Sequence, residues 1–68
     1  MIDNRTEIST FWSDDKSKKA VVYYSSVLGY EVDFFAEDIY IISHAYDGRS
    51  LQYHEDAAEN YVMGIKQV

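Results

Sequence analysis

The sequence has no cysteine, no proline and only three glycines among its 68 residues. Without cysteine, neither a disulfide framework nor a thiolate zinc site can stabilise the fold, so the stability must come from packing. The chain also lacks an apolar run long enough to span a membrane. Its first residues, Met1 to Arg5, show neither the cationic start nor the apolar stretch of a secretory signal. We therefore expect a small cytoplasmic protein with no membrane contact.

Positive charge is scarce as well. Six lysines and arginines stand against 12 aspartates and glutamates, which gives a formal net charge of −6. Affinity for nucleic acids depends on basic side chains that neutralise phosphates, so this charge argues against a nucleic-acid partner. The one cluster of cations in the sequence, Lys16, Lys18 and Lys19, lies beside Asp14 and Asp15. The acidic balance favours a basic protein as the partner.

What the sequence has in excess is aromatic residues: seven Tyr, three Phe and one Trp. With 47% hydrophobic residues, the chain is apolar enough to fold. β-Branched and aromatic residues dominate about 20–27, 30–36 and 39–46, which predicts three strands. Gly29 and the pair Glu37-Asp38 mark turns that are too short for a crossover connection. The strands should therefore form an antiparallel meander.

A helix is predicted after these strands, over about residues 51–66. Ser50 is a suitable N-cap because its hydroxyl can accept a hydrogen bond from an unpaired backbone N–H. Apolar residues then recur at helical spacing, and this stripe consists of Ala57, Ala58, Tyr61, Val62 and Ile65. The predicted fold class is α+β: a three-stranded antiparallel meander with one C-terminal helix packed on one face. We expect this βββα unit, residues 20–68, to be the single domain.

Residues 1–19 precede this domain and are predicted to form an N-terminal arm and a connector. Ile8, Phe11 and Trp12 recur at a spacing that suits one or two turns of helix. The same segment could instead lie as an extended arm across the sheet. The sequence leaves these two alternatives open.

A two-residue turn at Glu37-Asp38 sets the register of the second hairpin, and so determines which side chains share a face. The predicted pairs run from Ala36 with Ile39 to Glu31 with His44. The core face then carries Tyr30, Val32, Phe34, Ile39, Ile41 and Ala45. The opposite face carries Glu31, Asp33, Phe35, Tyr40, Ile42, His44 and Tyr46. In the first predicted strand, the side chains that point to either face are apolar. The sequence therefore does not show which face of this strand points toward the core.

The second face is not cleanly polar, and its aromatic residues need an explanation. Phe11 and Trp12 of the N-terminal arm could cover it, or the tyrosines could lie flat with solvated hydroxyls. Alternatively it is a partner or dimer surface, because aromatic patches rimmed by acid resemble the cores of interfaces. The predicted contact residues are Phe35, Tyr40, Ile42 and Tyr46, with Glu31 and Asp33 as an acidic rim.

The residues that could carry chemistry are few. A catalytic zinc needs three ligands, and the two histidines, His44 and His54, do not form such a set with neighbouring carboxylates. Glu31 and Asp33 share a strand face, but a chain of this length offers no deep cleft for paired-carboxylate chemistry. The sequence has no nucleophile motif and no phosphate-binding glycine loop. We expect no enzyme activity, no metal and no cofactor.

The segment from Gly29 to Ile65 resembles small uncharacterised proteins encoded by tailed marine cyanobacterial phages. The residues that carry this resemblance are Gly29-Tyr30-Glu31-Val32-Asp33-Phe34 and Tyr53-His54-Glu55-Asp56-Ala57-Ala58-Glu59-Asn60-Tyr61-Val62-Met63-Gly64-Ile65. The most specific part is Glu55 to Asn60 followed by an aromatic residue. The resemblance implies a phage gene product that works in a host cell, and it implies no particular activity.

A second resemblance is carried by the strand Gly29–Phe34, the turn Asp47-Gly48-Arg49-Ser50 and the helix segment Ala57-Ala58-Glu59-Asn60. In these segments the chain is similar to HicB-type antitoxins, whose partners are small basic toxin ribonucleases. The family's Pro-rich loop after the second strand is replaced by Ala36-Glu37-Asp38, and its C-terminal DNA-binding extension has no counterpart in this sequence. The resemblance implies an inhibitor that binds a basic protein.

Together these observations favour a small acidic, non-enzymatic protein-interaction module of phage origin. It would bind a host or phage protein in the cytoplasm through an acidic and aromatic sheet face. An antitoxin-like or nucleic-acid-mimicking inhibitor of a basic protein is the first alternative. A virion or structural component is the second. A second copy of the chain, forming a homodimer, is a further candidate partner.

Overall fold

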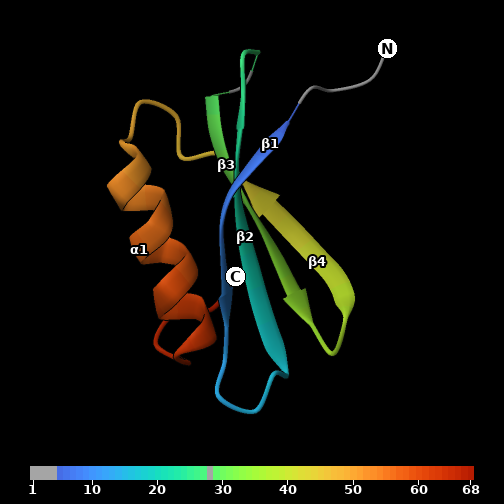
Figure 1. The fold of residues 1–68 in the computed structure, drawn as a ribbon. Helices are drawn as coiled ribbons and strands as arrows, with labels where there is room; N and C mark the ends of the chain where they lie inside the picture. Colours follow the sequence, from blue (N-terminus) through green and yellow to red (C-terminus); the bar gives the residue numbers. More distant parts are fainter. Residues whose placement is uncertain (1–4, 28) are drawn as a thin grey trace.

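Four antiparallel strands form one sheet, and a helix lies across one of its faces (Figure 1). The computed structural model describes residues 5–27 and 29–68. In chain order the elements are β1 (Thr6–Trp12), β2 (Lys18–Ser25), β3 (Gly29–Ala36), β4 (Ile39–His44) and α1 (Leu51–Val62). The strand order in the sheet is β1-β2-β3-β4, so neighbours in the sheet are also neighbours in sequence. The predicted α+β class and the antiparallel meander are confirmed.

The sheet has four strands and not the predicted three, because the N-terminal segment forms β1. The predicted helix is therefore wrong for Thr6–Trp12, and the predicted extended arm is corrected, because the segment is extended but pairs with β2 at the edge of the sheet instead of lying across a face. Residues 1–4 lie outside the described residues. β1 pairs with β2 along its length. Thr6, Ile8 and Thr10 are β-branched and favour a strand, and β2 offers them a neighbour. This pairing outweighs the helical spacing of the apolar residues.

The turn before β4 has the two residues that the sequence predicts. Glu37 and Asp38 both adopt left-handed backbone conformations, with φ of 53° and 65°. Two positive φ values in a two-residue loop are typical of a type I′ turn, whose twist matches that of the flanking strands. Neither residue is a glycine, so the turn carries backbone strain that glycine would avoid.

β4 contains a bulge that shifts its register by one residue. Phe35 pairs with Tyr40 as predicted, but Phe34 pairs with Ile42, so Ile41 is an extra residue. Beyond the bulge, the side chains of β4 change face relative to the predicted register. The pairs that we predicted beyond Phe35 and Tyr40 are therefore wrong.

The core lies between the sheet and α1. Its buried residues are Ala20, Val22, Val32, Phe34, Ala58, Tyr61 and Val62. The facing of β2, which the sequence left open, follows from this set: Ala20 and Val22 point toward the helix. The ring of Phe34 meets that of Tyr61 edge to face, with centroids 4.9 Å apart. The Tyr61 hydroxyl donates a hydrogen bond of 3.0 Å to the Phe35 carbonyl oxygen, which fixes the helix on β3.

Both ends of α1 are capped. The Ser50 hydroxyl accepts a hydrogen bond of 3.2 Å from the Tyr53 N–H, which confirms the predicted N-cap. The helix ends earlier than predicted because Gly64 adopts a φ of +83° and its N–H bonds back to the Tyr61 carbonyl. Ile65 lies beyond this cap and is exposed, so its predicted place in the buried stripe is wrong.

The helix packs against β1, β2 and β3, whereas β4 makes no comparable contact with it among the described residues. Figure 1 shows β4 on the side of the sheet that is remote from α1. β1 and β4 are the two edges of the sheet. One edge strand therefore lies under the helix, and the other extends past it.

Candidate functional site

The sheet face away from the helix, called the outer face below, carries a row of aromatic rings. The register places Trp12, Lys19, Phe35 and Tyr40 side by side, one from each strand. The Lys19 ammonium lies 5.2 Å from the Trp12 ring centroid and 4.3 Å from that of Phe35. The Phe35 and Tyr40 rings meet edge to face at 5.8 Å. The row is a continuous ladder of cation–π and aromatic contacts across the sheet.

Arg5 anchors the other end of the outer face. Its guanidinium donates a hydrogen bond of 2.7 Å to Glu31, and two of 3.2 and 3.1 Å to Asp33. It also lies 4.0 Å from the centroid of the Tyr23 ring. The hydrogen bonds to Asp33, followed by the bond to Glu31, raise the pKa of Arg5 above its usual value. The predicted acidic rim is therefore neutralised in part by a cation of the same chain.

The network continues from Asp33 into β4. The Ser43 hydroxyl donates a hydrogen bond of 2.6 Å to Asp33, which is 5% exposed. Because that bond uses the only hydroxyl proton of Ser43, the Tyr40 hydroxyl donates the 2.8 Å bond that joins it to Ser43. These bonds connect the residue before β1 with β3 and β4. They also fix the orientation of the exposed Tyr40 ring.

β4 exposes four consecutive apolar side chains at the edge of the sheet. Their exposed fractions are 64% for Ile39, 53% for Tyr40, 47% for Ile41 and 37% for Ile42. We call these four residues the β4 edge patch. The strand contains no acidic residue, lysine or arginine. An apolar and uncharged strand edge of this kind is a template for pairing with another chain.

The six residues predicted to contact a partner lie on two different surfaces. Four of them lie on the outer face: Glu31, Asp33, Phe35 and Tyr40. Ile42 and Tyr46 lie on the helix side, because the bulge reverses the facing of β4 and Tyr46 packs against the core. The same bulge pairs His44 with Val32 and not with the predicted Glu31. The single face that we predicted for all six residues is therefore wrong.

Sequence reasoning places Ile39 and Ile41 in the core, although both are exposed members of the β4 edge patch. The signal that could have identified them is the lack of alternation, since four apolar residues in a row give a strand no buried face to prefer. Of the residues expected to cover the outer face, Trp12 lies on it. Phe11 instead packs against the core on the helix side.

His54 links the start of α1 to the end of β4. It is 1% exposed, and its Nδ1 and Nε2 lie 2.7 and 2.5 Å from the carbonyl oxygens of Ser50 and Ala45. The rings of Tyr30 and Tyr46 lie 5.6 and 5.4 Å from the imidazole. The imidazole is thus enclosed by aromatic rings and backbone carbonyls, which gives it a structural role.

Tyr46 completes this cluster in an unfavourable conformation. Its backbone φ is +44°, a left-handed value that is uncommon for a bulky residue. Its hydroxyl is buried and has no hydrogen-bond partner among the described residues. Burial raises the pKa of Tyr46 above its usual value. The ring therefore contributes to the cluster through its packing.

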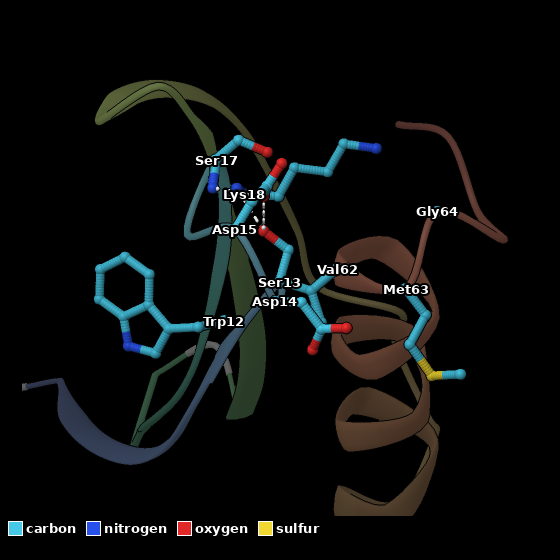
Figure 2. Close-up of a pocket in the computed structure, with 9 residues that line it drawn as sticks. All are labelled: Trp12, Ser13, Asp14, Asp15, Ser17, Lys18, Val62, Met63 and Gly64. Carbon is cyan, nitrogen blue, oxygen red and sulfur yellow. Dashed lines mark hydrogen bonds between the residues drawn. The ribbon is translucent and has the colours of Figure 1, made fainter.

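A shallow depression of about 490 Å³ lies between the β1–β2 turn and the end of α1 (Figure 2). The Ser13 hydroxyl and the Ser17 N–H each donate a hydrogen bond of 2.9 Å to Asp15. Hydrogen bonding, first of all from the Ser17 backbone, lowers the pKa of Asp15 to about 2. Figure 2 shows the Trp12 ring pointing away from the helix end. The hydrogen bonds to Asp15 therefore stabilise the turn.

Within residues 5–27 and 29–68, no three His, Cys, Asp or Glu side chains come together as a metal site would require. No helix in the described part of the chain has the length and apolar character needed to cross a bilayer. Comparison with known proteins finds no matching family model, no matching curated protein and no matching solved structure.

Proposed function

We propose that this chain is a small non-enzymatic protein-interaction module that binds a host or phage protein through β4 and the adjoining outer face. The β4 edge patch is the observation that supports this proposal most. Exposed apolar side chains gathered at one place on a small domain are typical of the cores of interfaces. Tyr40 belongs both to this patch and to the aromatic row, so one partner can contact both.

The neighbours of Tyr40 prepare it for binding. Its hydroxyl is held by Ser43, and its ring rests against Phe35. A side chain that is already fixed loses little conformational entropy when a partner covers it. Tyrosine is also among the residues that contribute most to binding energy at interfaces. Tyr40 is therefore the expected anchor of the contact.

Ile41 and Ile8 offer a matched test of this proposal. Both are bulged isoleucines on edge strands, and their exposed fractions are 47% and 41%. We expect tagged Ile41→Gln protein to lose the partner that wild type captures from a cyanobacterial lysate, and Ile8→Gln protein to retain it. Glutamine is neutral, so neither substitution alters the charge, and a thermal melt of each variant checks its folding. Equal recovery by the two variants contradicts the proposal.

An inhibitor of a basic protein is the second candidate, and the net charge of −6 favours it. Binding through screened surface charges weakens as salt rises, whereas binding through apolar contacts does not. Capture at low and at high salt therefore separates the two candidates. A partner held through the apolar contacts of β4 keeps part of its binding at high salt, and a partner held by charge alone is released. A virion component would instead co-purify with phage particles.

A further inference from the structure

The β4 edge patch belongs to a strand with one open side. In the described part of the chain no strand lies beyond β4, so its backbone N–H and C=O groups on that side have no strand partner. Natural edge strands are commonly protected by charged side chains or by proline, and β4 has neither. Its protection is the bulge at Ile41. Such an edge can accept an added strand.

Carboxylates lie at both ends of this open strand. Glu37 and Asp38 form the turn before β4, and Asp47 follows it, and all three are exposed. Among the described residues, none of the three forms an ion pair. Glu31 and Asp33, in contrast, are held by the nearby arginine. The charges at the strand ends therefore remain available to an incoming chain.

Two cations near the patch, Lys18 and Lys66, lie on the helix side and contact aromatic rings. Ile41 lines a shallow depression there, together with Lys18 and Lys66. The Lys18 ammonium lies 5.4 Å from the Tyr61 ring centroid, and that of Lys66 lies 5.6 Å from the Tyr46 ring centroid. Neither ammonium group forms an ion pair with the three carboxylates among the described residues.

A second copy of the chain is a poor occupant of this edge. If two β4 strands paired antiparallel about a twofold axis, Glu37 and Asp38 of one copy would approach Asp47 of the other. Like charges would then meet at both ends of the contact, between molecules that each carry a net charge of −6. The distribution of charge favours a partner strand with cations at its ends.

We propose that β4 binds an extended segment of a partner protein that has a β-branched, apolar middle and lysine or arginine at both ends. The segment adds a fifth strand beside β4. Its backbone pairs with the open edge, and its middle side chains contact the β4 edge patch. Its cations meet Glu37 and Asp38 at one end and Asp47 at the other. This inference rests on the proposed function, because it names the partner's chemistry for the same surface.

Two fluorescein-labelled peptides test this inference on the full chain. Both peptides have the same central sequence of alternating valine and threonine. The lysine peptide carries two lysines at each end, and the glutamate peptide carries two glutamates at each end. In anisotropy titrations at low salt, the lysine peptide should bind about tenfold more tightly than the glutamate peptide. High salt should reduce this ratio because it screens the charges. The variant Glu37→Gln with Asp38→Asn removes two carboxylates at nearly constant shape and should also lower the ratio, by about threefold.

The matched isoleucine variants locate the site. Ile41→Gln should weaken binding of the lysine peptide by about fivefold, through lost apolar contact, and Ile8→Gln should leave it unchanged. Equal affinity of the two peptides overturns the inference that the partner segment carries cations at its ends. It does not affect the proposed function, which the lysate experiment tests separately. Failure of the lysine peptide to bind, or an equal loss in both isoleucine variants, overturns strand addition at β4. Dimerisation of wild type that Ile41→Gln abolishes assigns the edge to a second copy, which also overturns the inference.

Discussion

The two edges of the sheet differ in what surrounds them. β1 and β4 each carry a bulged isoleucine, Ile8 and Ile41, of similar exposure. Beside Ile8 stand Glu7 and hydroxyl-bearing residues, and α1 packs against the strand. Beside Ile41 the residues are apolar, and the strand extends past the helix. A bulge and an unpaired backbone side are thus common to both edges, and the neighbouring side chains make the β1 edge polar and the β4 edge apolar.

β1 differs from β4 in its contacts with the helix. The Ser9 hydroxyl donates a hydrogen bond of 2.7 Å to Glu55 of α1, and Phe11 packs against the core. β4 is held from one side only, by its pairing with β3 and by the bond from Ser43 to Asp33. β1 is therefore held by both the sheet and the helix, whereas β4 is held mainly by the sheet.

The largest expected effect comes from truncating one helix-side residue on each edge. Phe11→Ala should lower the free energy of unfolding by about 2–3 kcal/mol, because it removes a partly buried ring from the core. Ile42→Ala should cost about 1 kcal/mol or less, because its side chain is already partly in water. Urea unfolding of the two variants measures this difference. A larger loss of unfolding free energy in Ile42→Ala than in Phe11→Ala would show that β4 contributes more to stability than β1, contrary to this account.

Removing Arg5 tests the network that connects the two edges across the outer face. Arg5→Met should cost about 2 kcal/mol, because it leaves the buried Asp33 carboxylate without its cation. Asp33→Asn in the Arg5→Met background should restore part of that loss, since residue 33 then carries no charge. A double-mutant cycle in urea measures the coupling. Costs that simply add would mean that the two side chains act independently.

The turns that lead to the two edges contain matched backbone strain. Lys16, in the β1–β2 turn, has a φ of 66°, and Asp38, before β4, has a φ of 65°. Lys16→Gly and Asp38→Gly should each raise the free energy of unfolding by up to about 1 kcal/mol, because glycine adopts positive φ without strain. Thermal melts of both variants measure the gain. Destabilisation by either glycine would show that the lost side-chain contacts outweigh the strain.

The smallest effect is expected from alkaline pH, and none is expected below pH 10. Burial raises the pKa of Tyr23, Tyr46 and Tyr61 above the usual value of 10.0. As pH rises, the tyrosines of the unfolded chain lose their hydroxyl protons before those of the folded chain do. Their contribution to the free energy of unfolding is therefore fully present below pH 10 and is lost as pH rises beyond it. Urea unfolding at a series of alkaline pH values measures the loss. In Tyr46→Phe the loss should be smaller, and an unchanged pH dependence would exclude a contribution from Tyr46.

Local signals in the sequence predicted the features that depend on a few adjacent residues. Ser50 before an apolar stripe predicted the N-cap, and Glu37-Asp38 between two apolar runs predicted a two-residue turn. Gly64 carries a comparable signal for the end of the helix, because a glycine after an apolar stripe commonly ends a helix with a positive φ. The predicted helix, over about residues 51–66, passes through Gly64 and is therefore too long.

The features that sequence reasoning missed depend on contacts between distant segments. β1 forms because β2 offers it a partner, and the spacing of its apolar residues does not encode that pairing. The bulge at Ile41 lies in a run of apolar residues, where either register leaves apolar side chains on both faces. One extra residue then moved Ile42, His44 and Tyr46 to the helix side. The candidate surface was thus predicted in composition but not in arrangement.

Amide hydrogen exchange of the chain with and without the lysine peptide tests the central claim, that β4 is the open edge, most directly. Exchange reports backbone hydrogen bonds, so it separates an added strand from side chains that merely adhere. The account predicts that the peptide slows exchange of amides within Ile39–His44 and leaves those of Thr6–Trp12 unchanged. Protection of β1 amides, or equal protection of both edges, would contradict it.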